Sequence, residues 1–209
     1  DLSLTQLPDG LTSLSTAFRE CTTIVYPPSI PSSVISMYYC FEGCTNLKTA
    51  PVLPGNLSDL SYCFQGCENL EEAPEIPSNV TTMQHTFKDC KKLTDAPVIP
   101  VGVTDLISCF EGCSNLVNVP PIACTSVKVR SAFQYCVKLK TIVITGTMYS
   151  NPSSDTPSYN MVNLYYGITN IESVYVSSEA QRNLLLNAGY MGFYDPPATD
   201  IVKIGPPWP

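Results

Sequence analysis

The hydrophobic positions of this chain recur every 23 residues from residue 18 to residue 133, without an insertion. Each copy has a phenylalanine, a cysteine three residues later and an aliphatic residue six residues later. A fixed period in the twenties indicates a solenoid, because one repeat is a single coil that cannot bury its apolar side alone. The pattern therefore predicts six coils on one continuous core, marked by Phe18, Phe41, Phe64, Phe87, Phe110 and Phe133.

Four more apolar positions complete each coil. In the second copy they are Ala50, Leu53, Leu57 and Leu60, at nine, twelve, sixteen and nineteen residues after the phenylalanine. Spacings of three and four are too regular for a loop, and each coil is too short for a full βαβ unit. We expect a short extended segment and about one turn of helix around the phenylalanine in each coil. This predicts a leucine-rich-repeat-like α/β solenoid of six 23-residue coils.

A proline column bears on the width of the predicted sheet. Proline stands ten residues after five of the six phenylalanines. Because proline has no N–H to donate to a strand ladder, we expect a narrow parallel sheet with two or three residues per strand. The column consists of Pro28, Pro51, Pro74, Pro97 and Pro120.

The period stops after Ile144, which divides the chain into a repeat solenoid over residues 1–145 and a C-terminal segment over residues 146–209. Residues 146–160 are turn formers and small polar residues, which predict a loop. The last residues, 205–209, contain three prolines and predict an extended tail.

A strand and a helix are predicted between that loop and the tail. Residues 171–176 alternate between apolar and polar side chains, as a strand does. Residues 177–188 predict a helix, with Ser177 or Ser178 as its N-cap and Gly189 as its end. The end of a solenoid exposes its hydrophobic core, so we expect this strand and helix to cap the last coil.

Ten cysteines raise the question of disulfides. Equivalent residues on stacked coils lie about 4.8 Å apart with parallel Cβ directions, whereas disulfide Cβ atoms lie about 3.8 Å apart. We therefore expect the column three residues after phenylalanine to be buried thiols. For Cys40, Cys63 and Cys109, a bridge within a coil or to the previous coil stays open. The repeated Cys-x-x-x-Cys spacing follows from the repeat itself, so no metal site is predicted.

The repeated motif resembles a known family. Phe-x-x-Cys-x-x-Leu followed by Ile-Pro-x-x-Val, on a 23-residue step, is similar to the BspA-like leucine-rich repeats of Bacteroides-type surface proteins. The resemblance covers roughly residues 1–145. It implies a protein of the cell surface, lipid-anchored through a removed N-terminal segment, or a secreted one. It also implies a monomer that binds a host or bacterial surface protein or glycan.

Charge and hydropathy narrow the partners further. The net charge of −7 disfavours nucleic acid and anionic membranes. The sequence contains no stretch of 18 apolar residues, so no transmembrane segment is predicted. The chain begins at Asp1 without methionine, which is typical of a trimmed start. The lack of an export signal therefore does not argue against a surface location.

Catalysis and cofactors are not expected. The single histidine, His85, lies near Cys90, Asp89 and Asp105 in the repeat, but all four belong to repeat columns. No nucleophile-elbow motif and no zinc-protease motif is present. The prediction is a non-catalytic chain without cofactor.

Two surfaces could carry binding. Tyr38, Tyr39 and Tyr62 lie on adjacent coils beside His85 and would form an aromatic patch; alternatively, these rings shield the edge of the core. The second surface is a variable column along the strand edge, whose acidic centre would favour a basic partner; alternatively, it is a solvated face. That column is Tyr26, Thr49, Glu72, Asp95 and Asn118.

Two functions remain. The favoured one is an interaction or adhesion module that binds through the solenoid surface. The alternative is a structural spacer within a larger surface protein, with no ligand of its own. A contiguous exposed aromatic patch favours binding, and an evenly polar surface favours the spacer.

Overall fold

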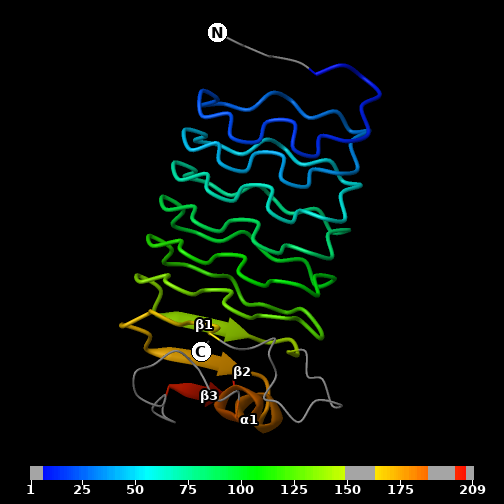
Figure 1. The fold of residues 1–209 in the computed structure, drawn as a ribbon. Coiled ribbons are helices and arrows are strands. Elements are labelled where there is room, and N and C mark those ends of the chain that lie inside the picture. The colour runs from blue at the N-terminus through cyan, green and yellow to red at the C-terminus, as the bar shows by residue number, and fades with distance from the viewer. Residues whose placement is uncertain (1–6, 149–162, 188–200, 206–209) are drawn as a thin grey trace.

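A computed structural model of the protein describes residues 7–148, 163–187 and 201–205. The chain winds into successive coils stacked along one axis, and the regular elements gather at the C-terminal end (Figure 1). The predicted helix end at Gly189 and most of the predicted loop and tail lie outside the described residues. The elements are β1 (Thr141–Ile144), β2 (Ser173–Val176), α1 (Glu179–Asn187) and β3 (Val202–Ile204).

The repeat phenylalanines form one line through the core. Neighbouring rings are nearly parallel, with centroids 5.2 to 5.7 Å apart and interplanar angles of at most 10°. This is the offset stacking that aromatic rings prefer. Phe18, in the first copy, keeps 7 % of its surface exposed, and the other five rings are fully buried. Residues 23 positions apart in sequence therefore lie one above another.

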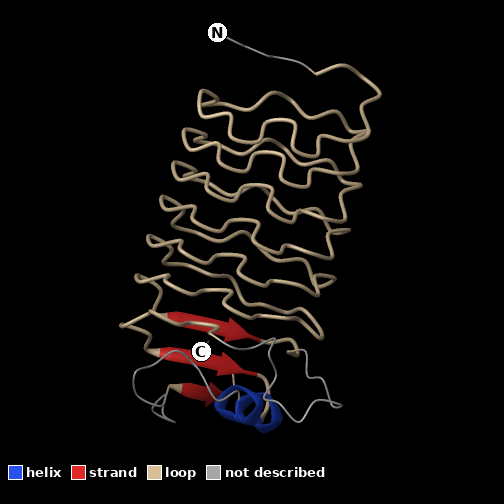
Figure 2. Cartoon of the chain, viewed as in Figure 1, coloured by secondary structure: helices blue, strands red, loops and turns tan. Residues whose placement is uncertain are grey.

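Hydrogen-bonded turns replace the expected turn of helix around each phenylalanine (Figure 2). In the second copy, the N–H of Cys40 donates to the Met37 carbonyl and that of Cys44 to the Phe41 carbonyl, both at 3.0 Å. The Phe41 N–H between them donates to the Cys63 carbonyl of the next coil at 2.8 Å. Because alternate N–H groups leave the coil, an α-helix cannot form here.

The recurring glycine before the column cysteine is explained by these turns. Gly43, Gly66 and Gly112 have φ between 71° and 76°, in the left-handed region that glycine occupies without strain. At Gly112 the side chain of Asp89 also lies directly over the Cα atom, so an added Cβ would clash with its carboxylate. The Glu-Gly-Cys and Gln-Gly-Cys motifs therefore serve backbone geometry.

The column cysteines are buried hydrogen-bond donors. Each Sγ donates to the carbonyl of the preceding coil's phenylalanine at 2.9 to 3.2 Å. Cys21, in the first copy, is half-buried, and the five that donate are fully buried. All ten cysteines fall within the described residues and are free thiols there. Thr86 takes the place of a second-set cysteine and donates its hydroxyl to the Leu60 carbonyl at 3.0 Å.

The sheet is narrower than expected in the interior coils and wider at the end. Single β-bridges join Thr49 to Glu72 and Asp95 to Asn118. The last repeat has Val143 in the proline column, and there the four-residue strand β1 forms. β1 pairs in parallel with β2, and β2 with β3. The width of the sheet thus changes at the coil where the proline column ends.

The C-terminal strand and helix cover the last coil, as the end of a solenoid requires. β2 places Val174 beside Ile142 and Val176 beside Ile144, and all four are buried. Helix α1 buries Leu185 in the same core.

The N-cap of α1 is Ser178, whose hydroxyl accepts the N–H of Gln181 at 3.3 Å. The Gln181 side chain is itself buried and accepts the N–H of Met148 at 2.8 Å. Strand β3 was not predicted, because three residues are too short for a recognisable alternation.

Residues 163–168 repeat the turn of the phenylalanine motif. The Phe133 N–H donates to the Leu164 carbonyl at 2.9 Å, and φ is positive at Asn163 and Gly167. Buried Tyr165 therefore takes the place of a phenylalanine, 32 residues after Phe133 (165 minus 133) instead of 23. Hydrogen bonds between coils and the β1–β2 pair join the segments before and after residue 145. The structure therefore does not separate two units there, and the division into a solenoid and a C-terminal segment stays a prediction.

Replacing Phe87 by alanine should destabilise the protein by about 3 to 5 kcal/mol, because the cavity lies between two stacked rings. Urea unfolding followed by circular dichroism measures the loss. Val52→Ala is the control, since that side chain is 90 % exposed, and it should stay within about 0.5 kcal/mol. Equal losses for the two variants would contradict the buried ring column.

A thiol assay in denaturant, without reductant, should find ten free groups, as in the structure. Under native conditions at pH 8, most should react slowly, because burial raises the pKa of Cys44 to about 12 and that of Cys124 to about 11. Cys21 is half-buried and should react first. Recovery of no thiols, which means five disulfides, would refute the stacked-thiol column.

Candidate functional site

Three rings from adjacent coils stack on the outside of the solenoid. Tyr39 and Tyr62 have centroids 4.3 Å apart at 15°, and Tyr62 and His85 have centroids 4.6 Å apart at 8°. Each stands two residues before its phenylalanine. The sequence prediction that these residues lie side by side is therefore met in the geometry. With Tyr38, they form what we call the aromatic patch.

Positive φ angles direct these side chains. Tyr39, Tyr62 and His85 have φ of 55°, 61° and 54°, a region that non-glycine residues rarely adopt. The N–H groups of Tyr62 and His85 each donate to the next coil at 2.9 Å, which holds the strained backbone in place. The inter-coil hydrogen bonds therefore fix the ring stack.

Tyr38 and Arg19 close the patch at its N-terminal end. Tyr38 packs edge-on against Tyr39, with centroids 4.4 Å apart at 87°, and is 40 % exposed. The Arg19 guanidinium lies 5.3 Å from the centroid of the Tyr39 ring and also pairs with Glu42. Arg19 was missed in the sequence because it belongs to the preceding repeat and stands in a different column.

The patch presents ring edges to solvent. Tyr39, Tyr62 and His85 are half-buried, so they cover the side of the coils and also remain accessible. Tyr62 is stacked between the rings of Tyr39 and His85, so the centre of the patch offers a partner hydroxyl groups and ring edges. Such a surface favours hydrogen bonds and edge contacts over the stacking of a ligand on a ring face.

The surroundings of His85 disfavour its charged form. Burial is the main cause that lowers its pKa below 6.5, and the positive charge of Lys88 adds to it. Arg130 acts in the same direction, while Glu111 and Asp105 oppose it. Among the described residues, no hydrogen-bond partner reaches the buried Nδ1 atom.

The second predicted column is an exposed row along the strand edge. Asn118 Nδ2 donates to Asp95 Oδ1 at 2.6 Å, and Thr94 donates to the other oxygen at 2.5 Å. These bonds, with that from Thr94 the larger cause, hold the pKa of Asp95 below its usual value. The predicted members are all exposed: Tyr26, Thr49, Glu72, Asp95 and Asn118.

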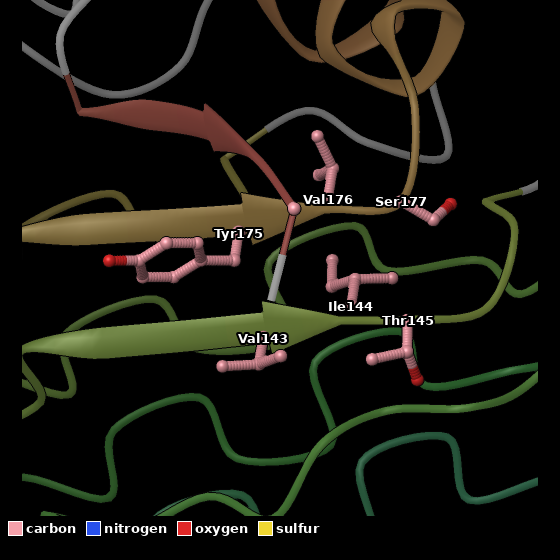
Figure 3. A pocket seen from close by; sticks show the side chains of 7 residues that line it. Val143, Ile144, Thr145, Tyr175, Val176 and Ser177 are labelled. Atoms are coloured by element: carbon pink, nitrogen blue, oxygen red, sulfur yellow. The ribbon is translucent and has the colours of Figure 1, made fainter. Parts of the chain in front are cut away.

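One hollow lies beside the strand-edge column and another at the C-terminal strands. An open hollow of about 520 Å³ lies beside the second column and is lined by Glu71, Glu72 and Asp95 among others. A smaller one of about 260 Å³ lies where β1 and β2 end; it is lined mainly by apolar side chains, with the hydroxyls of Thr145 and Ser177 at its rim (Figure 3). Neither brings together the nucleophile, base and oxyanion donors that a catalytic centre needs.

The described part of the chain offers neither a metal site nor a membrane-spanning helix. In residues 7–148, 163–187 and 201–205, no group of three or more His, Cys, Asp or Glu side chains is placed to hold a metal ion. Within the same ranges, no helix has the length and hydrophobicity to cross a membrane.

The free energy of unfolding should fall as the pH drops below 6.5, because His85 binds a proton more readily in the unfolded chain than in the folded one. The stability that comes from the neutral imidazole is fully present above pH 6.5 and is lost as the pH falls through the folded pKa. The protein has one histidine, so an NMR titration of its imidazole reports the folded pKa directly. His85→Phe keeps a ring in the stack and should remove this part of the pH dependence. A midpoint at or above 6.5 would contradict the buried, neutral imidazole.

Comparison with known proteins bears on the family and the fold. A search of curated proteins found no match. A leucine-rich repeat protein from Bacteroides ovatus ATCC 8483 is similar in structure, with a TM-score of 0.54 and 21 % identity, over 80 % of this chain and 53 % of that one. This chain thus spans about half the length of that protein. A leucine-rich repeat protein from T. pallidum aligns with a TM-score of 0.48 and 22 % identity, over 91 % and 83 % of the two chains.

The family follows from the repeats themselves. The model of the BspA type leucine-rich repeat region matches in six copies, over residues 1–116, 61–154 and 98–182. These matches cover well over half of the chain, and the B. ovatus structure supports the same type of fold. The chain therefore belongs to the BspA-type leucine-rich repeat family, as its 23-residue motif predicts.

Proposed function

We propose that this protein is a non-catalytic interaction or adhesion module of the cell surface or of the secreted fraction. Leucine-rich repeat proteins are generally interaction modules and typically lack catalysis, and BspA-type members are commonly surface or secreted proteins. The proposed partner is a host or bacterial surface protein or glycan, bound by a monomer. The proposed binding element is the solenoid of six 23-residue coils, with residues 146–209 as its cap and tail.

The aromatic patch is the observation that carries the proposal. Tyr39, Tyr62 and His85 occupy a position whose positive φ recurs in every coil, so the fold sets the backbone there whatever the side chain. In the same column, the C-terminal coils place the small residues Ser108 and Ser131, which are buried. Large rings are therefore not needed to complete a coil at this position. Their presence on adjacent coils supports a role in contact with a partner.

The structural spacer is the competing function. A spacer needs a stiff array and no surface of its own, and the stacked phenylalanines would supply the stiffness. It does not account for a surface cluster in which Tyr38 is exposed and Tyr39 and Tyr62 remain half-accessible. Soluble proteins rarely keep such a patch without a contact to make.

Removal of the tyrosine rings should weaken binding and leave the fold intact. The variant combines Tyr38→Ser with Tyr39→Asn and Tyr62→Asn, because asparagine tolerates positive φ. Immobilised wild-type protein is screened against glycans and purified surface proteins, and each hit is measured again with the variant. We expect at least a roughly tenfold loss of affinity, as for the aromatic anchors of other interfaces.

Tyr26→Ser is the matched control, since Tyr26 is 69 % exposed and belongs to the strand-edge column. Equal thermal stability of the variants and the wild type shows that a loss of binding does not come from unfolding. If wild-type protein binds nothing in the screen, the spacer function is favoured. If Tyr26→Ser abolishes binding and the triple variant does not, the aromatic patch is not the binding element.

A further inference from the structure

A second surface, formed by the proline columns, has its own chemistry. An open groove of about 1040 Å³ runs across the central coils and is lined by Pro51, Pro74 and Pro97 with Val52, Glu75 and Val98. Val52 is 90 % exposed and Val98 is 72 % exposed. Val52 and Val98 stand two repeats apart, with Glu75 on the coil between them, and prolines line the groove beside all three. Exposed apolar side chains gathered in this way are typical of an interaction surface. We call this surface the proline groove.

Carboxylates border the groove and one stands inside it. Ala73 and Pro97 line both the proline groove and the hollow that contains Glu71, Glu72 and Asp95, so the two surfaces are continuous. Glu71 lies 4.0 Å from Lys92. Neither Glu72 nor Glu75 has an ion pair within the described part of the chain. The surface is therefore apolar and negatively charged.

The prolines also determine which hydrogen bonds the groove can make. Each offers a carbonyl acceptor and has no N–H donor. Carboxylates and carbonyls together require a partner that supplies donors, and Lys and Arg side chains are donors without acceptors.

The spacing of the coils sets the spacing of the partner's side chains. Val52, Glu75 and Val98 are each eleven residues after a phenylalanine, so they follow one another along the stack. The phenylalanine rings of these three coils are 5.7 Å apart at both steps. In an extended chain, alternate side chains share a face and lie about 6.6 Å apart. Three alternate side chains of an extended partner, spaced slightly more widely than the rings, can thus reach valine, glutamate and valine in turn.

We propose that the proline groove binds an extended basic segment of a partner protein, with an apolar residue, Lys or Arg, and an apolar residue at alternate positions. The partner's cation pairs with Glu75, and its apolar side chains lie on Val52 and Val98. The net charge of −7 favours the approach of such a segment. This site is separate from the aromatic patch and does not depend on it.

Fluorescence anisotropy with the full chain tests the proposal. The probe is a fluorescein-labelled nonapeptide, Gly-Ser-Leu-Ser-Arg-Ser-Leu-Ser-Gly, compared with the same peptide carrying Glu in place of Arg. The Arg peptide should bind, more weakly at about 0.5 M salt than at low salt because the ion pair is screened, and the Glu peptide should not. Glu75→Gln should weaken binding about fivefold, and Val52→Ser with Val98→Ser about tenfold.

Val101→Ser is the matched control, because Val101 is also exposed, at 68 %, and does not line the groove. It should leave the affinity for the Arg peptide unchanged. The triple tyrosine variant should also leave this affinity unchanged, because its substitutions lie in the aromatic patch and test that surface separately. Failure of the Arg peptide to bind at millimolar concentration overturns the proposal. Equal binding of both peptides, or equal losses from Val101→Ser and the groove variants, also overturns it. A dimer in sedimentation that Val52→Ser with Val98→Ser abolishes would identify a second copy of the chain as the occupant instead.

Discussion

The alternating direction of the backbone N–H groups around each phenylalanine is the constraint on which the rest of the structure depends. One N–H closes a turn within its coil, and the next donates to the following coil, as Cys40 and Phe41 do. Because every coil needs carbonyls from its neighbour, a single coil cannot satisfy its own polar groups. The rings are then fixed one above another, and the array is a chain of nearest-neighbour contacts that must be capped. The Phe133 N–H continues the series by donating to Leu164, so the C-terminal segment completes a requirement that the repeats create.

The same alternation links the core to the surface. It produces positive φ two residues before and two residues after each phenylalanine. After the phenylalanine, the positive φ favours glycine, as at Gly112, where the Asp89 carboxylate also occupies the space that a Cβ would need. Before it, the side chain is a half-buried ring in some coils, as at Tyr62, and a buried hydroxyl in others, as at Ser108. This position can vary without disturbing the buried columns, and for that reason contacts with a partner can develop there at little cost to folding.

Most of the architecture could be predicted from columns, because burial is periodic and the period is constant. The positions of the buried phenylalanines and cysteines, and the proximity of Tyr39, Tyr62 and His85, follow from counting in steps of 23. The prediction of a helical turn around each phenylalanine was wrong, because apolar spacings of three and four also suit successive hydrogen-bonded turns. These spacings do not reveal which carbonyl accepts each N–H. The coil around Tyr165 was missed because nine additional residues interrupt the count and the marker residue is no longer phenylalanine. The proline groove was missed because the prolines were considered for the hydrogen bonds that they prevent and not for the surface that they form.

The two surfaces differ in chemistry because they come from different parts of the coil. At the aromatic patch the charges are already paired, as in Arg19 with Glu42 and Lys88 with Glu111, so recognition there depends on shape and on hydroxyl groups. At the proline groove Glu75 has no ion pair in the described residues, nor has Glu72 in the adjoining hollow, and recognition there responds to charge and salt. The surfaces stand thirteen residues apart within a 23-residue repeat, about half a coil. Two partners can therefore bind at the same time, one on each surface. A single partner that reached both surfaces would gain affinity from the linkage, without any new contact.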